Sequence, residues 1–137
     1  MKTKETEMRT SVIKKTLLLA LLLATSSAWA EWVQVAETES SNFYLDFKSV
    51  RKEGNLRTAW VLIDFRAEQA GGGMSRQVRY EYDCKEVRFN ILAFSLHSGS
   101  MAQGSVLSTK SYAKGSDWNE IFPESSADAI LKIVCRK

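Results

Sequence analysis

Alternating apolar and polar residues run through most of the chain after residue 31 and predict a sheet of about six strands. The clearest alternation is in Ser75–Asp83, where Val78, Tyr80 and Tyr82 point to one side and polar residues point to the other. The other predicted strands are 32–36, 42–47, 56–65, 87–96 and 106–112. Both faces of 56–65 are largely apolar, so we expect this strand at the centre of the sheet, covered on both sides.

Polar, glycine-containing segments separate the predicted strands. Residues 51–55 are predicted to form a turn, and residues 83–86 a tight connection. Glycine clusters at 71–73 and 99–104 lie between strands rather than ahead of a helix, so they do not have the pattern of a phosphate-binding loop. We therefore predict flexible hairpin loops at both places, the second within 98–104.

The hydrophobic period changes from two to between three and four near the end of the chain. Pro123 ends the preceding segment, Ser125 is a good N-cap, and Asp128 suits the positive end of a helix. Apolar residues then recur on one helical face, at Ala127, Ile130, Leu131 and Val134. A helix this short is marginal by itself in water, so it is expected to dock on the sheet.

The first thirty residues have the three parts of a removable secretory signal. Five basic residues precede the apolar run 16–24, and Ala28-Trp29-Ala30 has the small-x-small form accepted at cleavage sites. A transmembrane anchor is the alternative, but a membrane-spanning helix needs about 20 apolar residues. We predict a signal peptide at 1–30, cleavage after Ala30, and one domain at 31–137 with no transmembrane span.

Cleavage after Ala30 would change the charge of the protein. The whole chain has 19 Lys and Arg residues and 16 Asp and Glu residues. Five of the basic and two of the acidic residues lie in the predicted signal, which leaves the mature domain neutral. Its net charge therefore gives no support for general attraction to nucleic acid or anionic lipid.

Two cysteines, Cys84 and Cys135, remain in the mature domain. In an oxidising compartment such a pair is most simply a disulfide. The alternatives are two free buried thiols or a metal pair, for which only His97 could add a soft ligand. Cys84 continues the apolar row of its strand and Cys135 borders the apolar face of the helix. The predicted fold class is therefore α+β: an antiparallel sheet with a C-terminal helix packed on one face and tied by a disulfide.

Few residues suggest catalysis. His97 lies at a loop edge, and the sequence singles out neither a nucleophile nor an orienting partner for it. Asp64, Glu81, Asp83 and Glu86 lie among basic residues, which predicts cross-strand ion pairs on a solvated sheet face rather than a catalytic pair of carboxylates. No nucleophile elbow or metal-spaced cluster occurs. We interpret the domain as non-enzymatic, without a cofactor or metal.

Binding surfaces remain as candidate sites. Single-stranded nucleic acid could stack on five aromatic residues, namely Trp60, Tyr80, Tyr82, Phe89 and Phe94, but export and neutral charge favour a role in the core for all five. Four basic residues near Cys84 form the candidate partner-binding set: Arg76, Arg79, Lys85 and Arg88. Arg79 and Arg88 are expected on the outward face, where a basic patch could meet an acidic stretch of a partner protein. The alternative is an ordinary surface on which nearby carboxylates pair with these cations.

The order of these signals resembles the surface-adhesin protein E family of bacterial exported proteins. The resemblance covers nearly all of residues 31–137. Its matching pieces are NFYLD at 42–46, Ser49-Val50, RYEYDC at 79–84, the loop 98–104 and ADAILKIVC at 127–135. Trp118 and Pro123, just before the predicted helix, also fit the family. It implies a sheet of about six antiparallel strands, with the helix tied by a Cys84–Cys135 disulfide. It also implies adhesion, because the family includes an adhesin for host proteins such as vitronectin and laminin.

The function expected from the sequence is an exported, non-catalytic binding module for a host matrix or envelope protein. The alternative is a periplasmic housekeeping or inhibitor-type domain that binds a peptide, a lipid fragment or an envelope enzyme. The expected location is the periplasm or the cell surface. No lipid anchor is expected, because no cysteine lies near the predicted cleavage site.

Overall fold

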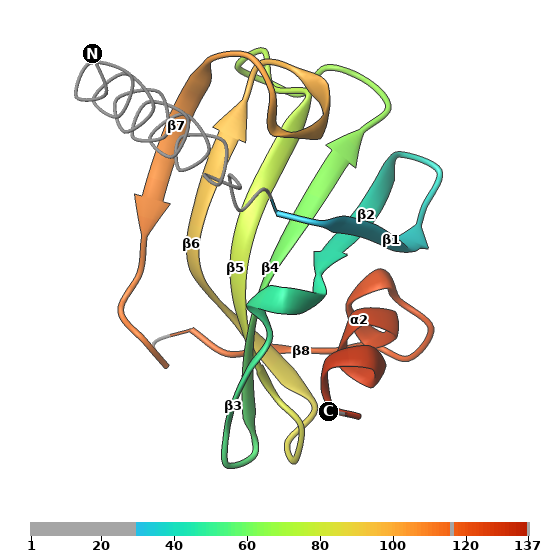
Figure 1. Cartoon of the computed structure of the whole chain (residues 1–137), viewed down its shortest axis with the longest axis vertical. Helices are drawn as coiled ribbons and strands as arrows, with labels where there is room; N and C mark the ends of the chain where they lie inside the picture. The colour runs from blue at the N-terminus through green and yellow to red at the C-terminus, as the bar shows by residue number, and fades with distance from the viewer. Residues whose placement is uncertain (1–29, 116, 137) are drawn as a thin grey trace, which may run out of the picture.

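The computed structural model describes residues 30–115 and 117–136, which form one antiparallel sheet and one C-terminal helix (Figure 1). The main path of the sheet is β1-β2-β4-β5-β6-β7, while β3 pairs with β4 and β8 pairs with β6. The strands are β1 (Trp32–Glu37), β2 (Ser41–Asp46), β3 (Arg51–Glu53), β4 (Leu56–Phe65), β5 (Ser75–Asp83), β6 (Arg88–His97), β7 (Val106–Ser111) and β8 (Asn119–Glu120). The predicted α+β fold class is confirmed. The predicted signal segment lies outside the described residues except for Ala30, so it stays a prediction.

Two short strands add to the six that were predicted. Arg51–Glu53 was assigned to a turn, but it pairs with Leu56–Thr58 as one side of a hairpin whose turn contains Gly54. Gly54 has a φ of +58°, which glycine adopts at little cost. Asn119–Glu120 pairs with Arg88 and Phe89 at the edge of β6. Both strands are too short to give an alternating pattern, so only the tertiary structure reveals them.

The centre of the sheet is formed by β4 and β5, whose bounds are those predicted. The two strands pair in unbroken register from Leu56↔Asp83 to Asp64↔Ser75. Val61 and Leu62 point to opposite faces of β4, and both side chains are fully buried. The prediction that this strand is covered on both sides is confirmed.

A β-bulge in β6 explains why its sequence changes from alternating to almost continuously apolar. Arg79 pairs with Ala93, but the next residue, Tyr80, pairs with Ile91, so Leu92 is the extra residue. An extra residue reverses which face the following side chains occupy. Phe89 and Ile91 before the bulge therefore share a face with the apolar residues at even positions after it.

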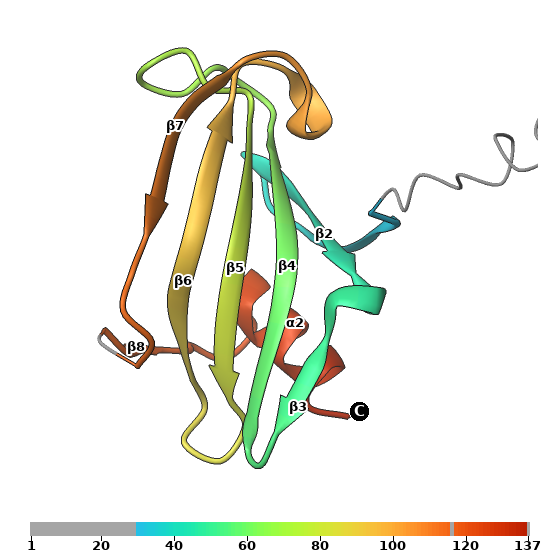
Figure 2. The same cartoon turned by 60° about the vertical axis from the view of Figure 1, so that its left-hand side comes forward.

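The helix α2 (Ser126–Val134) packs on one face of the sheet, and Figure 2 shows it behind the strands. Its N-cap is Ser125, whose Oγ accepts a hydrogen bond from the Asp128 amide at 3.1 Å, as predicted. The Asp128 carboxylate accepts a hydrogen bond from the Glu124 amide at 3.0 Å. It thus satisfies a second backbone amide near the start of the helix. The core beneath the helix consists of Leu45, Ala59, Val61, Tyr82, Ile121, Ile130, Leu131 and Val134.

The glycine-rich loop at 98–104, predicted to be flexible, is anchored to the sheet. The Asp64 carboxylate accepts hydrogen bonds from the Ser100 hydroxyl at 2.7 Å and the Met101 amide at 2.8 Å. Ser75 Oγ donates to the Gly99 carbonyl at 2.5 Å and accepts from the amide of residue 102 at 2.8 Å. Asp64 therefore holds a loop, which is not the cross-strand ion pair predicted for it.

Candidate ligand-binding surface

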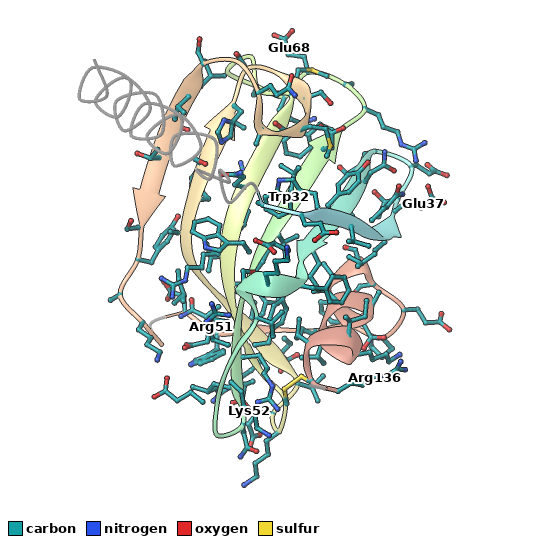
Figure 3. The ribbon with its side chains drawn as sticks, viewed as in Figure 1. Trp32, Glu37, Arg51, Lys52, Glu68 and Arg136 are labelled. Carbon is teal, nitrogen blue, oxygen red and sulfur yellow. A yellow bond between two sulfur atoms is a disulfide. The ribbon has the colours of Figure 1, made fainter. Side chains whose placement is uncertain are left out.

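A disulfide between Cys84 and Cys135 joins the end of β5 to the end of α2 (Figure 3). The two Cα atoms lie 5.8 Å apart, and the sequence separation is 51 residues. The predicted pairing is thus confirmed. The bond ties the C-terminal end of α2 to the sheet, and residues near the N-terminal end of the helix line a small pocket.

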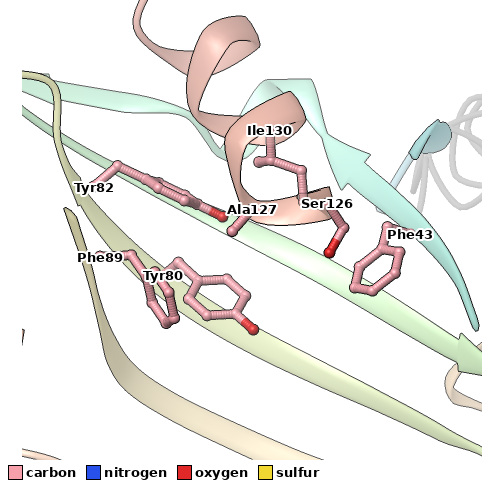
Figure 4. A pocket seen from close by; sticks show the side chains of 7 residues that line it. All are labelled: Phe43, Tyr80, Tyr82, Phe89, Ser126, Ala127 and Ile130. Carbon is pink, nitrogen blue, oxygen red and sulfur yellow. The ribbon is translucent and has the colours of Figure 1, made fainter. Parts of the chain in front are cut away.

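This aromatic pocket lies between the first turn of α2 and the sheet (Figure 4). Its volume is about 40 Å³, which is enough for water or a small polar group. Figure 4 shows the Ser126 hydroxyl and the ring of Tyr80 turned toward this space. The lining residues are Phe43, Tyr80, Tyr82, Phe89, Ser126, Ala127 and Ile130.

The two tyrosines of the pocket stay neutral over the physiological pH range. Burial raises the pKa of Tyr80 to about 12, and the nearby Arg76 offsets a smaller part of that rise. Burial also raises the pKa of Tyr82 well above its ordinary value. Tyr80 contacts Phe89 edge-on, with ring centroids 5.5 Å apart. The pocket therefore combines apolar rings with phenol groups that can donate hydrogen bonds.

Two rings with a cation at each end form a row that continues from the pocket, from β5 across β6 to the end of β7. The Arg76 guanidinium lies 4.8 Å from the centroid of the Phe94 ring. The Phe94 and Tyr112 rings are 6.4 Å apart, and Lys110 Nζ lies 4.7 Å from the Tyr112 centroid. Each contact is within the range of a favourable cation–π or aromatic interaction. We call these four residues the cation–aromatic row.

The structure does not bring the four basic residues of the candidate partner-binding set onto one face of the sheet. Arg76 belongs to the cation–aromatic row, whereas Arg79 alternates to the opposite face, beside Trp60 and Ala93. Lys85 is exposed in the β5–β6 turn, which is nine positions, or roughly 30 Å, from Arg76 along the chain. Arg79 shares its face with Arg88, because Arg88 pairs with Asp83, which lies four positions along β5 from Arg79. Arg76 lies on the other face, so the four residues do not form one surface.

Arg88, the fourth member of the set, is engaged by its neighbours. Its Nε lies 3.1 Å from Asp83 Oδ2, and its guanidinium lies 4.5 Å from the centroid of the Trp118 ring. Burial alone would raise the pKa of Asp83, but hydrogen bonds from the Glu86 amide, Arg88 and the Lys85 amide lower it overall. The ion-paired alternative therefore describes Arg88 well.

The prediction that Glu81 lies on a solvated face of the sheet is wrong. Its side chain is only 1 % exposed, and its carboxylate lies 3.5 Å from Lys114 Nζ. The same ammonium group lies 3.2 Å from the Glu53 carboxylate. The interactions with these two carboxylates, led by the hydrogen bond to Glu53, raise the pKa of Lys114. Lys114 is 33 positions from Glu81 in sequence, so this pairing could not be predicted from strand alternation.

His97 is buried and its Nε2 lies 2.8 Å from the Ser95 hydroxyl. Burial lowers its pKa, which favours the neutral ring. Within residues 30–115 and 117–136, no carboxylate completes this pair as an orienting group, and no group of three metal-binding side chains occurs. The contact orders the end of β6, where Ser75 and Val106 flank His97 on the neighbouring strands.

Sequence reasoning missed Phe94, Lys110 and Tyr112 as surface residues. Phe94 was assigned to the core, and the other two were only part of a predicted strand. The available signal was the spacing of Lys110 and Tyr112, because residues two apart on a strand share a face. Their contact with Phe94 depends on the bulge and the register of β6, which the sequence does not show.

A single antiparallel sheet with a helix tied across one face defines a small disulfide-bonded α+β domain. The family model for Surface-adhesin protein E matches residues 32–136, so the chain belongs to that family. No curated protein sequence matches the chain significantly. Among the described residues, no helix is both long and apolar enough to cross a membrane.

Solved structures of protein E from Haemophilus influenzae are similar to this fold. One has a TM-score of 0.58 at 9 % identity and covers 81 % of this chain and 88 % of its own. A second crystal form has a TM-score of 0.57 at 10 % identity, covering 81 % and 91 %. Protein E from non-typeable Haemophilus influenzae has a TM-score of 0.56 at 10 % identity, covering 81 % and 79 %. At these identities the likeness establishes the fold.

Proposed function

We propose that this chain is an exported, non-catalytic binding module whose partner is a host matrix protein or a protein of the cell envelope. Membership of the surface-adhesin protein E family over residues 32–136 is the observation that carries this proposal. Export is consistent with the Cys84–Cys135 disulfide, because such bonds persist in oxidising compartments. The surface also offers rings and cations that suit a protein partner.

We further propose that exposed cations not engaged by carboxylates contribute to partner binding. Arg79 and Lys85 are exposed and form no ion pair with any residue in the described part of the chain. Arg76 and Lys110 likewise contact rings rather than carboxylates. Charges of this kind mainly increase the association rate and make binding salt-dependent. Arg88 contributes less because Asp83 already neutralises it.

Saturable binding to immobilised vitronectin, laminin or a cell-envelope extract tests the proposed function. Arg79→Glu and Lys85→Glu should each weaken binding roughly twofold to fivefold, the range expected for exposed charges. Lys48→Glu is the matched control, because Lys48 is an exposed cation already paired with Glu31 at 3.2 Å. Absence of saturable binding to all three surfaces would contradict the function, and equal effects of all three variants would contradict the assignment of residues.

Cell fractionation and surface proteolysis of intact cells separate the two envelope locations. Protease-sensitive protein on intact cells supports adhesion to host proteins. A soluble periplasmic pool that is protected from the protease supports a role on an envelope partner instead.

A further inference from the structure

The strand β7 presents a free backbone edge. The Tyr112 amide donates to the Leu92 carbonyl of β6 at 2.9 Å, which fixes the direction of the amides before it. Because amide directions alternate along a strand, the amides and carbonyls of Thr109 and Ser111 point away from β6. Figure 2 shows β7 at the outer edge of the sheet, and no described strand pairs with its far side.

Both edge strands carry a register irregularity, but at different positions. In β1 it lies in the middle of the strand, between Gln34 and Ala36, where a bulge interferes with pairing to another strand. In β7 it lies at the start, where His97 pairs with Val106 and Leu96 with Ser108, so Ser108–Ser111 keep regular register with β6. All six residues of β7 are exposed, and Val106 and Leu107 keep 56 % and 42 % of their surface in contact with solvent. Exposed apolar residues on a free edge are typical of a surface that accepts another strand.

The charge on this edge indicates what kind of segment would bind. Lys110 lies on the Tyr112 ring, 4.7 Å from its centroid, and no carboxylate of the described residues forms an ion pair with it. On the same face the row continues to Arg76 over Phe94. This face of the edge therefore carries two positive charges, each in contact with an aromatic ring. Such a surface favours an acidic segment as its ligand.

We infer that the outer edge of β7 binds an extended acidic segment of the partner protein as an additional strand, an inference that rests on the proposed function. The added strand would lie about 4.8 Å from β7, with hydrogen bonds to the backbone of Thr109 and Ser111. A glutamate opposite Lys110 would have its Cβ about 5 Å from that of Lys110, within reach of the ammonium group. Backbone bonds provide affinity, and Lys110 selects acidic sequences.

Fluorescence anisotropy with a labelled peptide of alternating threonine and glutamate tests this inference on the purified chain. Thr109→Pro removes one outward amide without removing a bond to β6, and it should weaken binding about tenfold, the effect of one lost hydrogen bond. Thr109→Val keeps the amide and should bind as the parent does. Lys110→Glu should also weaken binding, and a peptide with lysine in place of glutamate should not bind.

Hydrogen exchange provides a second readout that does not depend on how well the proline variant folds. The amides of Thr109 and Ser111 should exchange more slowly when the glutamate peptide is present. No binding of the peptide, or equal binding by the Thr109→Pro and Thr109→Val proteins, would overturn the inference. Self-association that Thr109→Pro abolishes would also overturn it, because the edge would then pair with a second copy. If vitronectin, laminin or envelope binding survives Thr109→Pro unchanged, the proposed function stands and only this inference fails.

Discussion

Removing the Cys84–Cys135 disulfide is the sharpest test of how this domain is stabilised. The bond closes a loop across a sequence separation of 51 residues. The chain-entropy model gives about 4 kcal/mol for a loop of this length, through restriction of the unfolded chain. Typical domains have about 5–15 kcal/mol of total stability. The double variant Cys84→Ala/Cys135→Ala should therefore remain folded in dilute buffer but unfold at much lower denaturant concentrations.

Urea denaturation followed by far-UV circular dichroism measures this effect. With a denaturant slope of about 1.5 kcal/mol/M, a loss of 4 kcal/mol lowers the midpoint by roughly 2–3 M. Ile130 and Val134 are at most 2 % exposed beneath the helix, so α2 should stay docked in the variant and its folded spectrum should match that of the parent. Reduced and alkylated parent protein should unfold with the variant, and reductant should not shift the variant further.

Two results would refute this reasoning. If the oxidised parent and the double variant unfold at the same urea concentration, closure of the loop contributes little to stability. If the variant instead loses helical signal in dilute buffer while the sheet keeps its midpoint, the bond acts locally on α2 and not on the whole unfolded chain. Intact mass without reductant establishes that the parent carries the bond.

Three further changes test the core, the buried histidine and the helix cap. Ile130→Ala should cost about 2–5 kcal/mol, because the side chain is 2 % exposed in the core; a urea midpoint close to the parent's would contradict this packing. His97 has a lowered pKa in the folded state, so the unfolded chain binds more protons as pH falls below about 6.5. Stability should therefore fall between pH 7 and 5 in the parent but less in His97→Gln, measured by urea unfolding at both pH values, and equal slopes would exclude His97 as the cause. Ser125→Ala should cost about 0.5–2 kcal/mol through loss of the N-cap bond to Asp128, whereas Ser126→Ala serves as the neighbouring control and should cost less.

Much of the local structure follows from the sequence because it depends on short-range periodicity. The alternation in Ser75–Asp83 and the apolar faces of Leu56–Phe65 predicted both strands with the bounds found in the structure. The N-cap at Ser125 and the spacing of apolar residues predicted α2. The two cysteines predicted the bond between helix and sheet, since Cys84 continues the apolar row of its strand and Cys135 borders the apolar face of the helix.

The position of the candidate surface was decided by contacts between residues distant in sequence. The extra residue at Leu92 turns Phe94 to the face of Arg76, and the register of β7 brings Tyr112 beside Phe94. The segment after β7 carries Lys114 to the buried Glu81 carboxylate. Alternation within one strand shows that two faces exist, but not which neighbouring strand, bulge or loop meets each face. Strand register and the paths of the connecting segments set those contacts. Only the tertiary structure could therefore distinguish the cations without a carboxylate partner from those in ion pairs.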